Sequence, residues 1–242
     1  MKLARPDVFH PRIVLAGCPA LPEGDGDDAG LVAALGKRGL HARWMSWDDP
    51  ATLTADLVIL RATFDYIDRL DEFMSWTHQV ANLLNPARVV PWNSDKRYLA
   101  DLAAAGVPTI PFFDPRIEAG ETALVFIGGA QSHAFTKGPI LRQPEARSPA
   151  DPDFEVWDVG HQALAAAAAH LDLSPEELLY ARVDVIGGRA DPRVLEVALV
   201  EPSLGWMQLD EATRDRQQRE FVLAVESALD RFGLGPLSHR RP

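Results

Sequence analysis

Short apolar runs alternate with amphipathic stretches over the first hundred residues of the chain. Residues 13–17 and 56–60 are apolar at their centres, as is typical of buried parallel strands, and 41–47 has the same character. Between these runs, helical spacing or helix-start and helix-stop signals cover 27–38 and 69–84. The alternation predicts an α/β domain built on an open, mostly parallel sheet.

Further elements are expected before residue 114. Residues 89–90 predict a short strand, a helix capped by Ser94 or Asp95 runs to about residue 105, and 107–113 is expected to be extended. The first domain is therefore assigned to residues 1–93.

The second half of the chain has a different pattern, with pairs of glycines between strand-like runs. Such pairs predict β-hairpins. The expected strands are 121–126 and 132–135 around Gly128-Gly129, and 178–186 and 193–200 around Gly187-Gly188. Helices are expected at 151–171, after a Pro-rich loop, and at 211–232. Antiparallel strands combined with helices predict an α+β domain, which is assigned to residues 94–242.

Composition supports a folded protein and argues against two classes of partner. The 242 residues are 47% hydrophobic and 24% charged, which is enough for real cores. The formal net charge of −11 argues against a nucleic-acid partner, because phosphate binding needs clustered Lys and Arg side chains. The longest run that looks apolar, 163–169, is mostly alanine and far too short to cross a bilayer, so no membrane partner is expected.

The cysteine content and the N-terminal residues predict a cytoplasmic protein. Cys18 is the only cysteine, so an internal disulfide is excluded and a reducing compartment is expected. Residues 1–11 are polar and have no apolar core like that of a signal peptide. Cys18 ends the first expected strand and is expected to be a small buried residue rather than a nucleophile.

The second expected hairpin carries a pattern of charges that fits phosphate chemistry. Arg182 and Asp184 are two residues apart on one strand and therefore share a face, and Glu196 on the next strand can lie beside them. Carboxylates that converge with an arginine suit Mg²⁺ together with nucleotide phosphates. The same spacing also fits an ordinary amphipathic hairpin with a solvated polar face.

Segments spread over nearly the whole chain together resemble the ATP-grasp superfamily of ligases. ARVDV…VLEVALVEPS resembles its metal-binding hairpin, and WNSDKRYLADLAAAGVPTIP resembles its D-K…G-[IV]-P helix and strand. EAGETALVFIGGAQSHAFTKGP resembles its central hairpin. PALPEGDGDDAGLVAAL and ILRATFDY resemble N-terminal motifs of a bacterial glutathione-synthetase-like branch, and the chain resembles cycloserine-forming cyclo-ligases and D-alanine–D-alanine ligases.

The resemblance implies ATP and Mg²⁺ as cofactors and assigns roles to residues at matching positions. Asp184 and Glu196 match the metal ligands, with Glu201 as a further ligand. Arg182 matches the catalytic arginine that stabilises the acyl phosphate. Lys96 matches a nucleotide-phosphate lysine. Lys137 is placed near phosphate by its match, although an exposed lysine on an edge strand is the open alternative.

The resemblance also implies a small-molecule substrate. The acidic loop with Asp25, Asp27 and Asp28 matches the place where related ligases hold an amino group, although acidic residues at a helix start are also ordinary capping. Arg61 and Asp65 follow another strand of the same sheet, at the edge where such sheets bind ligands. Arg142 is expected to hold a substrate carboxylate or to be a surface residue.

Two departures from the family pattern bear on activity. Ala198 stands where the second ligand after Glu196 is usually Asn or Glu, and alanine cannot bind metal. Near residues 116–117 the family inserts a lobe with a second phosphate lysine and a glycine-rich loop, and the chain contains no such block. Residues absent from the sequence as given and a true deletion both remain open as explanations.

The function expected from these observations is an ATP- and Mg²⁺-dependent ligase that joins a carboxylate to an amine, or cyclises one molecule, through an acyl phosphate. The substrate is expected to be small and amino-acid-like, and a homodimer is left open. Two alternatives remain: a non-catalytic binding protein that keeps the ATP-grasp fold, and an unrelated enzyme, such as a nucleotide-sugar transferase, whose hairpin carboxylates bind metal by coincidence.

Overall fold

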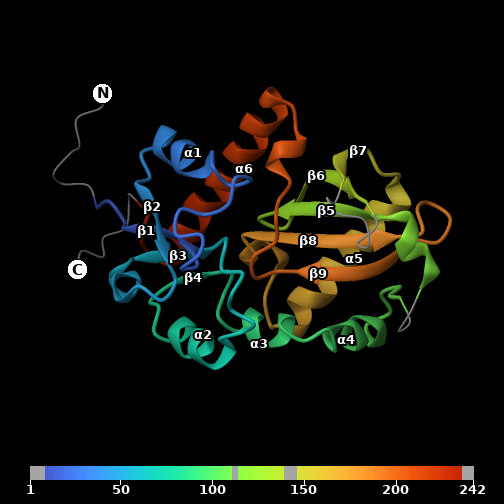
Figure 1. Cartoon of the computed structure of the whole chain (residues 1–242), viewed down its shortest axis with the longest axis horizontal. Helices are drawn as coiled ribbons and strands as arrows, with labels where there is room; N and C mark the ends of the chain where they lie inside the picture. Colours follow the sequence, from blue (N-terminus) through green and yellow to red (C-terminus); the bar gives the residue numbers. More distant parts are fainter. Residues whose placement is uncertain (1–8, 111–113, 139–145, 236–242) are drawn as a thin grey trace.

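The structure, a computed structural model, describes residues 9–110, 114–138 and 146–235. It contains two β-sheets that lie side by side, one formed by N-terminal strands and one by C-terminal strands (Figure 1). The first sheet is parallel throughout and the second is antiparallel throughout. The predicted fold class, α/β followed by α+β, is confirmed. Within the described ranges, no helix is both long and apolar enough to span a bilayer.

The parallel sheet has the strand order β2–β1–β3–β4. Its strands are β1 (Ile13–Gly17), β2 (Ala42–Ser46), β3 (Leu57–Leu60) and β4 (Leu83–Leu84). β1 and β3 are buried along their whole length because helices cover both faces. Ile13 and Leu15 pack on the side of α1 (Leu31–Lys37), whereas Val14 and Ala16 pack on the side of α2 (Leu70–Thr77).

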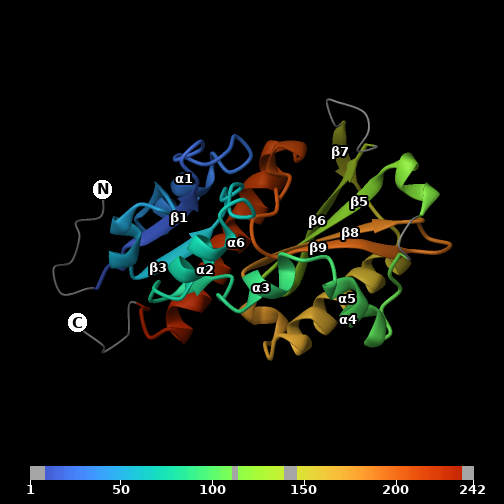
Figure 2. The same cartoon turned by 60° about the horizontal axis from the view of Figure 1, so that its bottom comes forward.

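The antiparallel sheet has the order β7–β6–β5–β8–β9. Its strands are β5 (Glu121–Ile127), β6 (Ala130–Lys137), β7 (Arg147–Ala150), β8 (Tyr180–Ile186) and β9 (Arg193–Ala198). One face is covered by α5 (Phe154–His170), against which α4 (Tyr98–Ala104) packs (Figure 2). Both predicted hairpins are confirmed.

The last helix, α6 (Glu211–Arg231), contacts both halves of the molecule. Phe221, Val222 and Val225 share one core with Ile13 of the parallel sheet and Val125 of the antiparallel sheet. α6 therefore packs against both sheets. The remaining elements are α3 (Val89–Asn93) and the 3₁₀ turns η1 (Pro50–Thr54), η2 (Pro115–Ala119), η3 (Pro175–Glu177) and η4 (Trp206–Gln208).

Three local predictions are wrong, and each involves a short segment whose neighbours decide its conformation. The helix expected at 69–84 ends at Thr77, and its last two residues form β4 beside β3. Residues 89–90 begin α3 instead of a strand. The Pro-rich loop before α5 contains β7. A run of two or three apolar residues shows that the segment is buried, but it does not distinguish a strand from a helix.

The chain passes directly from the first half to the second at the predicted interruption. Only three residues separate Ile110 from Asp114, and the Asp114 carboxylate caps η2, which leads into β5. The family's nucleotide-covering lobe is therefore not part of this chain between residues 110 and 121.

A buried ion pair joins the two halves. Arg61, the first residue after β3, donates from Nε and Nη2 to the two carboxylate oxygens of Asp28 at 2.9 and 3.1 Å. Nη2 also donates to the carbonyl of Pro202 (2.9 Å), and the guanidinium lies over the Tyr180 ring. Burial lowers the pKa of Arg61, but Asp28 outweighs this effect and holds that pKa above its ordinary value. The arginine is therefore charged, and its carboxylate partner is required.

Two side chains of the first half bond the second half at nearby points. Asn85 is fully buried; its side-chain nitrogen donates to the carbonyls of Tyr180 and Leu199, and its oxygen accepts from the N–H of Leu179. Asn93 bonds β9 in the same way, through Val197 and Leu199. These contacts fix the end of the β8–β9 hairpin relative to the parallel sheet.

The buried pair yields a stability prediction. Arg61→Met leaves Asp28 buried without a counter-charge, so we expect the free energy of unfolding to fall by about 3–5 kcal/mol in urea titrations. The double variant Arg61→Met/Asp28→Leu removes both charges and should recover at least about 1 kcal/mol of that loss.

The control is the exposed pair between Arg12 and Asp56. Arg12→Met should cost clearly less than Arg61→Met, because water screens an exposed ion pair. Equal losses for Arg61→Met and Arg12→Met would show that the buried pair does not hold the two halves together.

Candidate functional site

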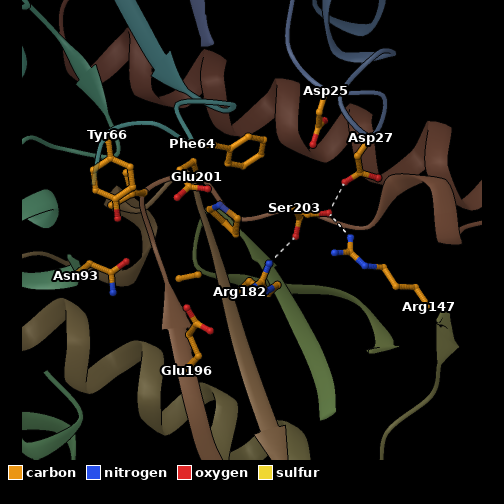
Figure 3. A pocket seen from close by; sticks show the side chains of 13 residues that line it. Asp25, Asp27, Phe64, Tyr66, Asn93, Arg147, Arg182, Glu196, Glu201 and Ser203 are labelled. Atoms are coloured by element: carbon orange, nitrogen blue, oxygen red, sulfur yellow. Dashed lines mark hydrogen bonds between the residues drawn. The ribbon is translucent and has the colours of Figure 1, made fainter. Parts of the chain in front are cut away.

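A cavity of about 340 Å³ lies at the seam between the two halves (Figure 3). We call it the seam cavity. One side is formed by the loops that follow β1 and β3, at the carboxyl edge of the parallel sheet, and the other by β8, β9 and the segment after β9. Its lining residues are Asp25, Asp27, Phe64, Tyr66, Asn93, Arg147, Arg182, Glu196, Ala198, Val200, Glu201, Pro202 and Ser203.

The predicted acidic loop divides into a cavity wall and structural anchors. Asp27 accepts hydrogen bonds of 2.8–3.0 Å from a hydroxyl and two backbone N–H groups within residues 203–207. Asp28 is buried against Arg61 and does not line the cavity. Asp25 lines the cavity and accepts one bond from the N–H of Asp28 (3.1 Å). Asp25 and Asp27 both line the cavity, and Asp25 accepts fewer hydrogen bonds from the protein than Asp27 does.

Two guanidinium groups face this acidic wall. Arg182 is held by a two-pronged ion pair with Asp184, at 2.9 Å for each contact, and its Nη1 donates to the carbonyl of Ser203. Arg147 donates to the Ser203 hydroxyl at 2.9 Å, and that hydroxyl donates to Asp27 (Figure 3). Ser203 thus links both cationic groups to the acidic loop.

Two glutamates complete the cavity. Burial raises the pKa of Glu201 to about 7, and the opposing charges of Arg182 and Arg61 do not cancel this effect. Glu196 also lines the cavity and is 3.9 Å from the amine of Lys96. Glu201 therefore changes protonation near neutral pH, inside a cavity that is otherwise charged.

Beside the cavity, a cluster of charged side chains lies within the antiparallel sheet. Lys137 on β6 donates to Asp184 on β8 at 2.7 Å and pairs with Glu121 on β5. We refer to Lys137, Glu121, Asp184 and Arg182 as the Lys137 cluster. Lys137 is 7% exposed and β6 is an inner strand, so the alternative of an exposed edge-strand lysine is wrong.

The predicted metal ligands do not form a ligand set for Mg²⁺. Both oxygens of Asp184 accept bonds from cationic side chains, and Ala198 offers no donor. Among the residues described, no group of three or more His, Cys, Asp or Glu side chains is arranged to hold a metal ion. Mg²⁺ takes hard oxygen ligands, usually one or two carboxylates together with nucleotide phosphates, and Asp184 as arranged does not fit it because cationic side chains already bond both of its oxygens.

The other predicted site residues lie around the cavity or away from it. Lys96 is exposed and, with Lys137, borders a groove of about 1030 Å³ between α4 and β9, which shares Glu196 with the seam cavity. Asp65 accepts from the indole N–H of Trp47 and from Arg69, and it does not line the cavity. Arg61 forms the buried ion pair with Asp28 described above. Arg142 lies outside the described residues.

Sequence reasoning missed Arg147, Ser203 and Glu121. Arg147 falls in the segment expected to be a Pro-rich loop. It belongs instead to β7, whose pairing with β6 places Arg147 at the cavity. Glu121 lies directly opposite Lys137 in the β5–β6 register. Counting outward from the glycine turn between the two strands could have predicted this cross-strand pair.

The raised pKa of Glu201 yields a pH prediction. The folded protein retains a proton on Glu201 between its unfolded value near 4.3 and about 7, so stability attributable to this group is lost as pH rises through that interval. We expect the free energy of unfolding of Glu201→Gln to gain on the order of 1–3 kcal/mol relative to wild type between pH 5 and 8.

Denaturant titrations at pH 5, 6, 7 and 8 measure this difference, with Glu23→Gln as the exposed control. A difference between wild type and Glu201→Gln that is constant across this range would contradict the assignment of the shifted group.

Comparison with known proteins places this architecture among ligases. Residues 13–85 match the family described as the N-terminal domain of the D-cycloserine synthetase DcsG. The cycloserine biosynthesis protein DcsG of Streptomyces lavendulae is 28% identical over 263 residues, covering 74% of this chain and 88% of the relative. Because 74% of 242 residues is about 179, about 84 positions of that relative have no counterpart here.

Solved structures agree. The crystal structure of D-cycloserine synthetase DcsG matches with a TM-score of 0.78 and 26% identity, over 90% of this chain and 99% of the other. The fold is shared with D-alanine–D-alanine ligase from Bacillus anthracis, complexed with ATP, at a TM-score of 0.63 and 13% identity over 92% and 98% of the two chains. It is also shared with the ATP-grasp ligase PsnB, complexed with Mg and ADP, at a TM-score of 0.59 and 13% identity over 90% and 99%. These similarities in sequence and structure support the assignment of the chain to the ATP-grasp superfamily of ligases.

Proposed function

We propose that this ATP-dependent ligase joins a carboxylate to an amine of small amino-acid-like substrates, or closes one such molecule on itself, through an acyl phosphate. The observation that carries the proposal is the seam cavity, where Asp25 and Glu201 face Arg182 across a space of small-molecule size. D-Cycloserine synthetase and D-alanine–D-alanine ligase, which share the fold, are named for products of the same chemical kind.

The cavity offers complementary groups for the two ends of such a substrate. Asp25 is placed to attract an ammonium group, while Arg182 and Arg147 are placed to attract a carboxylate or the phosphate attached to it. Arg182 is oriented by Asp184 before any ligand arrives, so its charge is in place where negative charge develops during phosphoryl transfer.

Proton transfer has a candidate group in the same cavity. An amine attacks an acyl phosphate only after losing a proton, and a carboxylate that titrates near neutral pH is suited to accept it. Glu201 lines the cavity, and its pKa is raised to about 7. We derive no step through a divalent ion, because the Lys137 cluster does not fit one as arranged.

Specific observations favour a second candidate, a binding protein of the same fold that does not catalyse ligation. Ala198 replaces a ligand position, Asp184 is closed in ion pairs, and about 84 positions of the curated relative are absent. The absent lobe would cover the nucleotide in the family to which the chain belongs, so ATP would bind at a more open surface here.

An ATP-turnover assay tests the proposal. Purified protein with ATP, Mg²⁺ and a panel of D- and L-amino acids and their amides should release ADP only with an accepted substrate, and mass spectrometry should detect a product lighter by one water than its precursors. Arg182→Ala should lower kcat by about 10²–10³, because an oriented cation has been removed from the transferring phosphate.

Arg182→Lys keeps a charge and should lose less, and Arg189→Ala on the exposed hairpin turn should behave as wild type. ATP binding without ADP release on every substrate pair would support the non-catalytic candidate. Unchanged turnover in Arg182→Ala would contradict the role assigned to that arginine.

A further inference from the structure

The Lys137 cluster is built by the register of three strands. Glu121 on β5 lies opposite Lys137 on β6, and the next strand, β8, places Asp184 opposite Ala123. All three charged side chains are buried, with Asp184 fully so. The amine of Lys137 therefore contacts Glu121 on the adjacent strand β5 and, across β5, Asp184 on β8.

The cluster is electrically balanced without any added ion. Its two carboxylates, Glu121 and Asp184, face the amine of Lys137 and the guanidinium of Arg182. Asp184 Oδ2 accepts from both Lys137 (2.7 Å) and Arg182 (2.9 Å), and Oδ1 accepts from Arg182 (2.9 Å). A buried carboxylate with this many charge-assisted bonds has little remaining capacity for another cation.

A divalent ion at this hairpin would need Asp184 together with its cross-strand neighbour Glu196. Glu196 is partly exposed and lines both the seam cavity and the groove beside α4, and Lys137, which is bonded to Asp184, lines the same groove. Adding a doubly charged ion beside Lys137 and Arg182 would place three cations around two or three carboxylates. Mutual repulsion opposes that arrangement unless Lys137 leaves.

We propose that Lys137 is a built-in counter-cation of Asp184, and that a divalent ion binds at Asp184 only in exchange for the Lys137 amine. The proposal rests on the proposed function only in taking this hairpin as the face that meets the nucleotide. In the nucleotide-free protein the hairpin has no divalent-ion site of its own. Free metal therefore does not load the hairpin, and displacement of Lys137 is part of any loading event.

Manganese titration of the nucleotide-free protein tests the proposal, with free Mn²⁺ followed by electron paramagnetic resonance. Wild type should bind Mn²⁺ no better than Asp184→Asn. Lys137→Met leaves the cluster with an excess negative charge and should bind one Mn²⁺ about 10- to 100-fold more tightly than wild type. The double variant Lys137→Met/Asp184→Asn should lose that gain.

Lys37→Met, at an exposed lysine on α1, is the matched control and should match wild type. Circular dichroism confirms folding, and Lys137→Gln replaces Lys137→Met if the methionine variant does not fold. A one-to-one Mn²⁺ site in wild type that is lost in Asp184→Asn would overturn the proposal, as would folded Lys137 variants that gain no affinity. The titration contains no nucleotide or substrate, so its outcome can be interpreted even if the ligase assay shows no activity.

Discussion

The guanidinium of Arg61 is buried between the two sheets, and a charge in that position requires a partner. Asp28 supplies the partner from the loop after β1, and the carbonyl of Pro202 supplies a further acceptor from the segment after β9. One buried charge therefore fixes two loops of the parallel sheet and the end of the β8–β9 hairpin at a common point. The walls of the seam cavity are the continuations of those same segments.

This arrangement explains why adjacent carboxylates of one loop serve different purposes. Asp28 neutralises Arg61 and Asp27 caps the turn at residues 203–207, so both are committed to holding the cavity together. Asp25, a little earlier in the loop, remains at the wall. A substrate ammonium group would thus meet a carboxylate whose position is set by its two buried or bonded neighbours.

Charge balance rather than metal coordination organises the hairpin beside the cavity. Lys137 and Arg182 compensate Asp184, one of the carboxylates that the family pattern associates with Mg²⁺. The nucleotide-covering lobe is also absent between residues 110 and 121, and Ile110 and Glu121 both line the groove between α4 and β9. The two observations concern the same face of the antiparallel sheet and distinguish this chain from its longer relatives.

The sequence by itself determined the elements whose signal is local. Continuous apolar runs predicted β1 and β3, glycine pairs predicted both hairpins, and helical spacing predicted α5 and α6, because burial on one or both faces imposes those periods on the chain. The same local reasoning, with the ordered motifs, placed Arg182, Glu196 and Asp25 at one site, and the structure brings all three to the seam cavity.

Only the tertiary structure decided which charged residues bind each other and which face the cavity. No local signal distinguishes Asp28 from Asp25, since the difference arises from Arg61, 33 residues later in the chain. The burial of Lys137 likewise depends on strand neighbours at residues 121 and 184. Two-residue segments such as β4 and the start of α3 took their conformation from the surfaces they cover. Which distant residues pair depends on the distances between their side chains in space. Those distances are set by the packing of the folded chain and cannot be read from local sequence patterns.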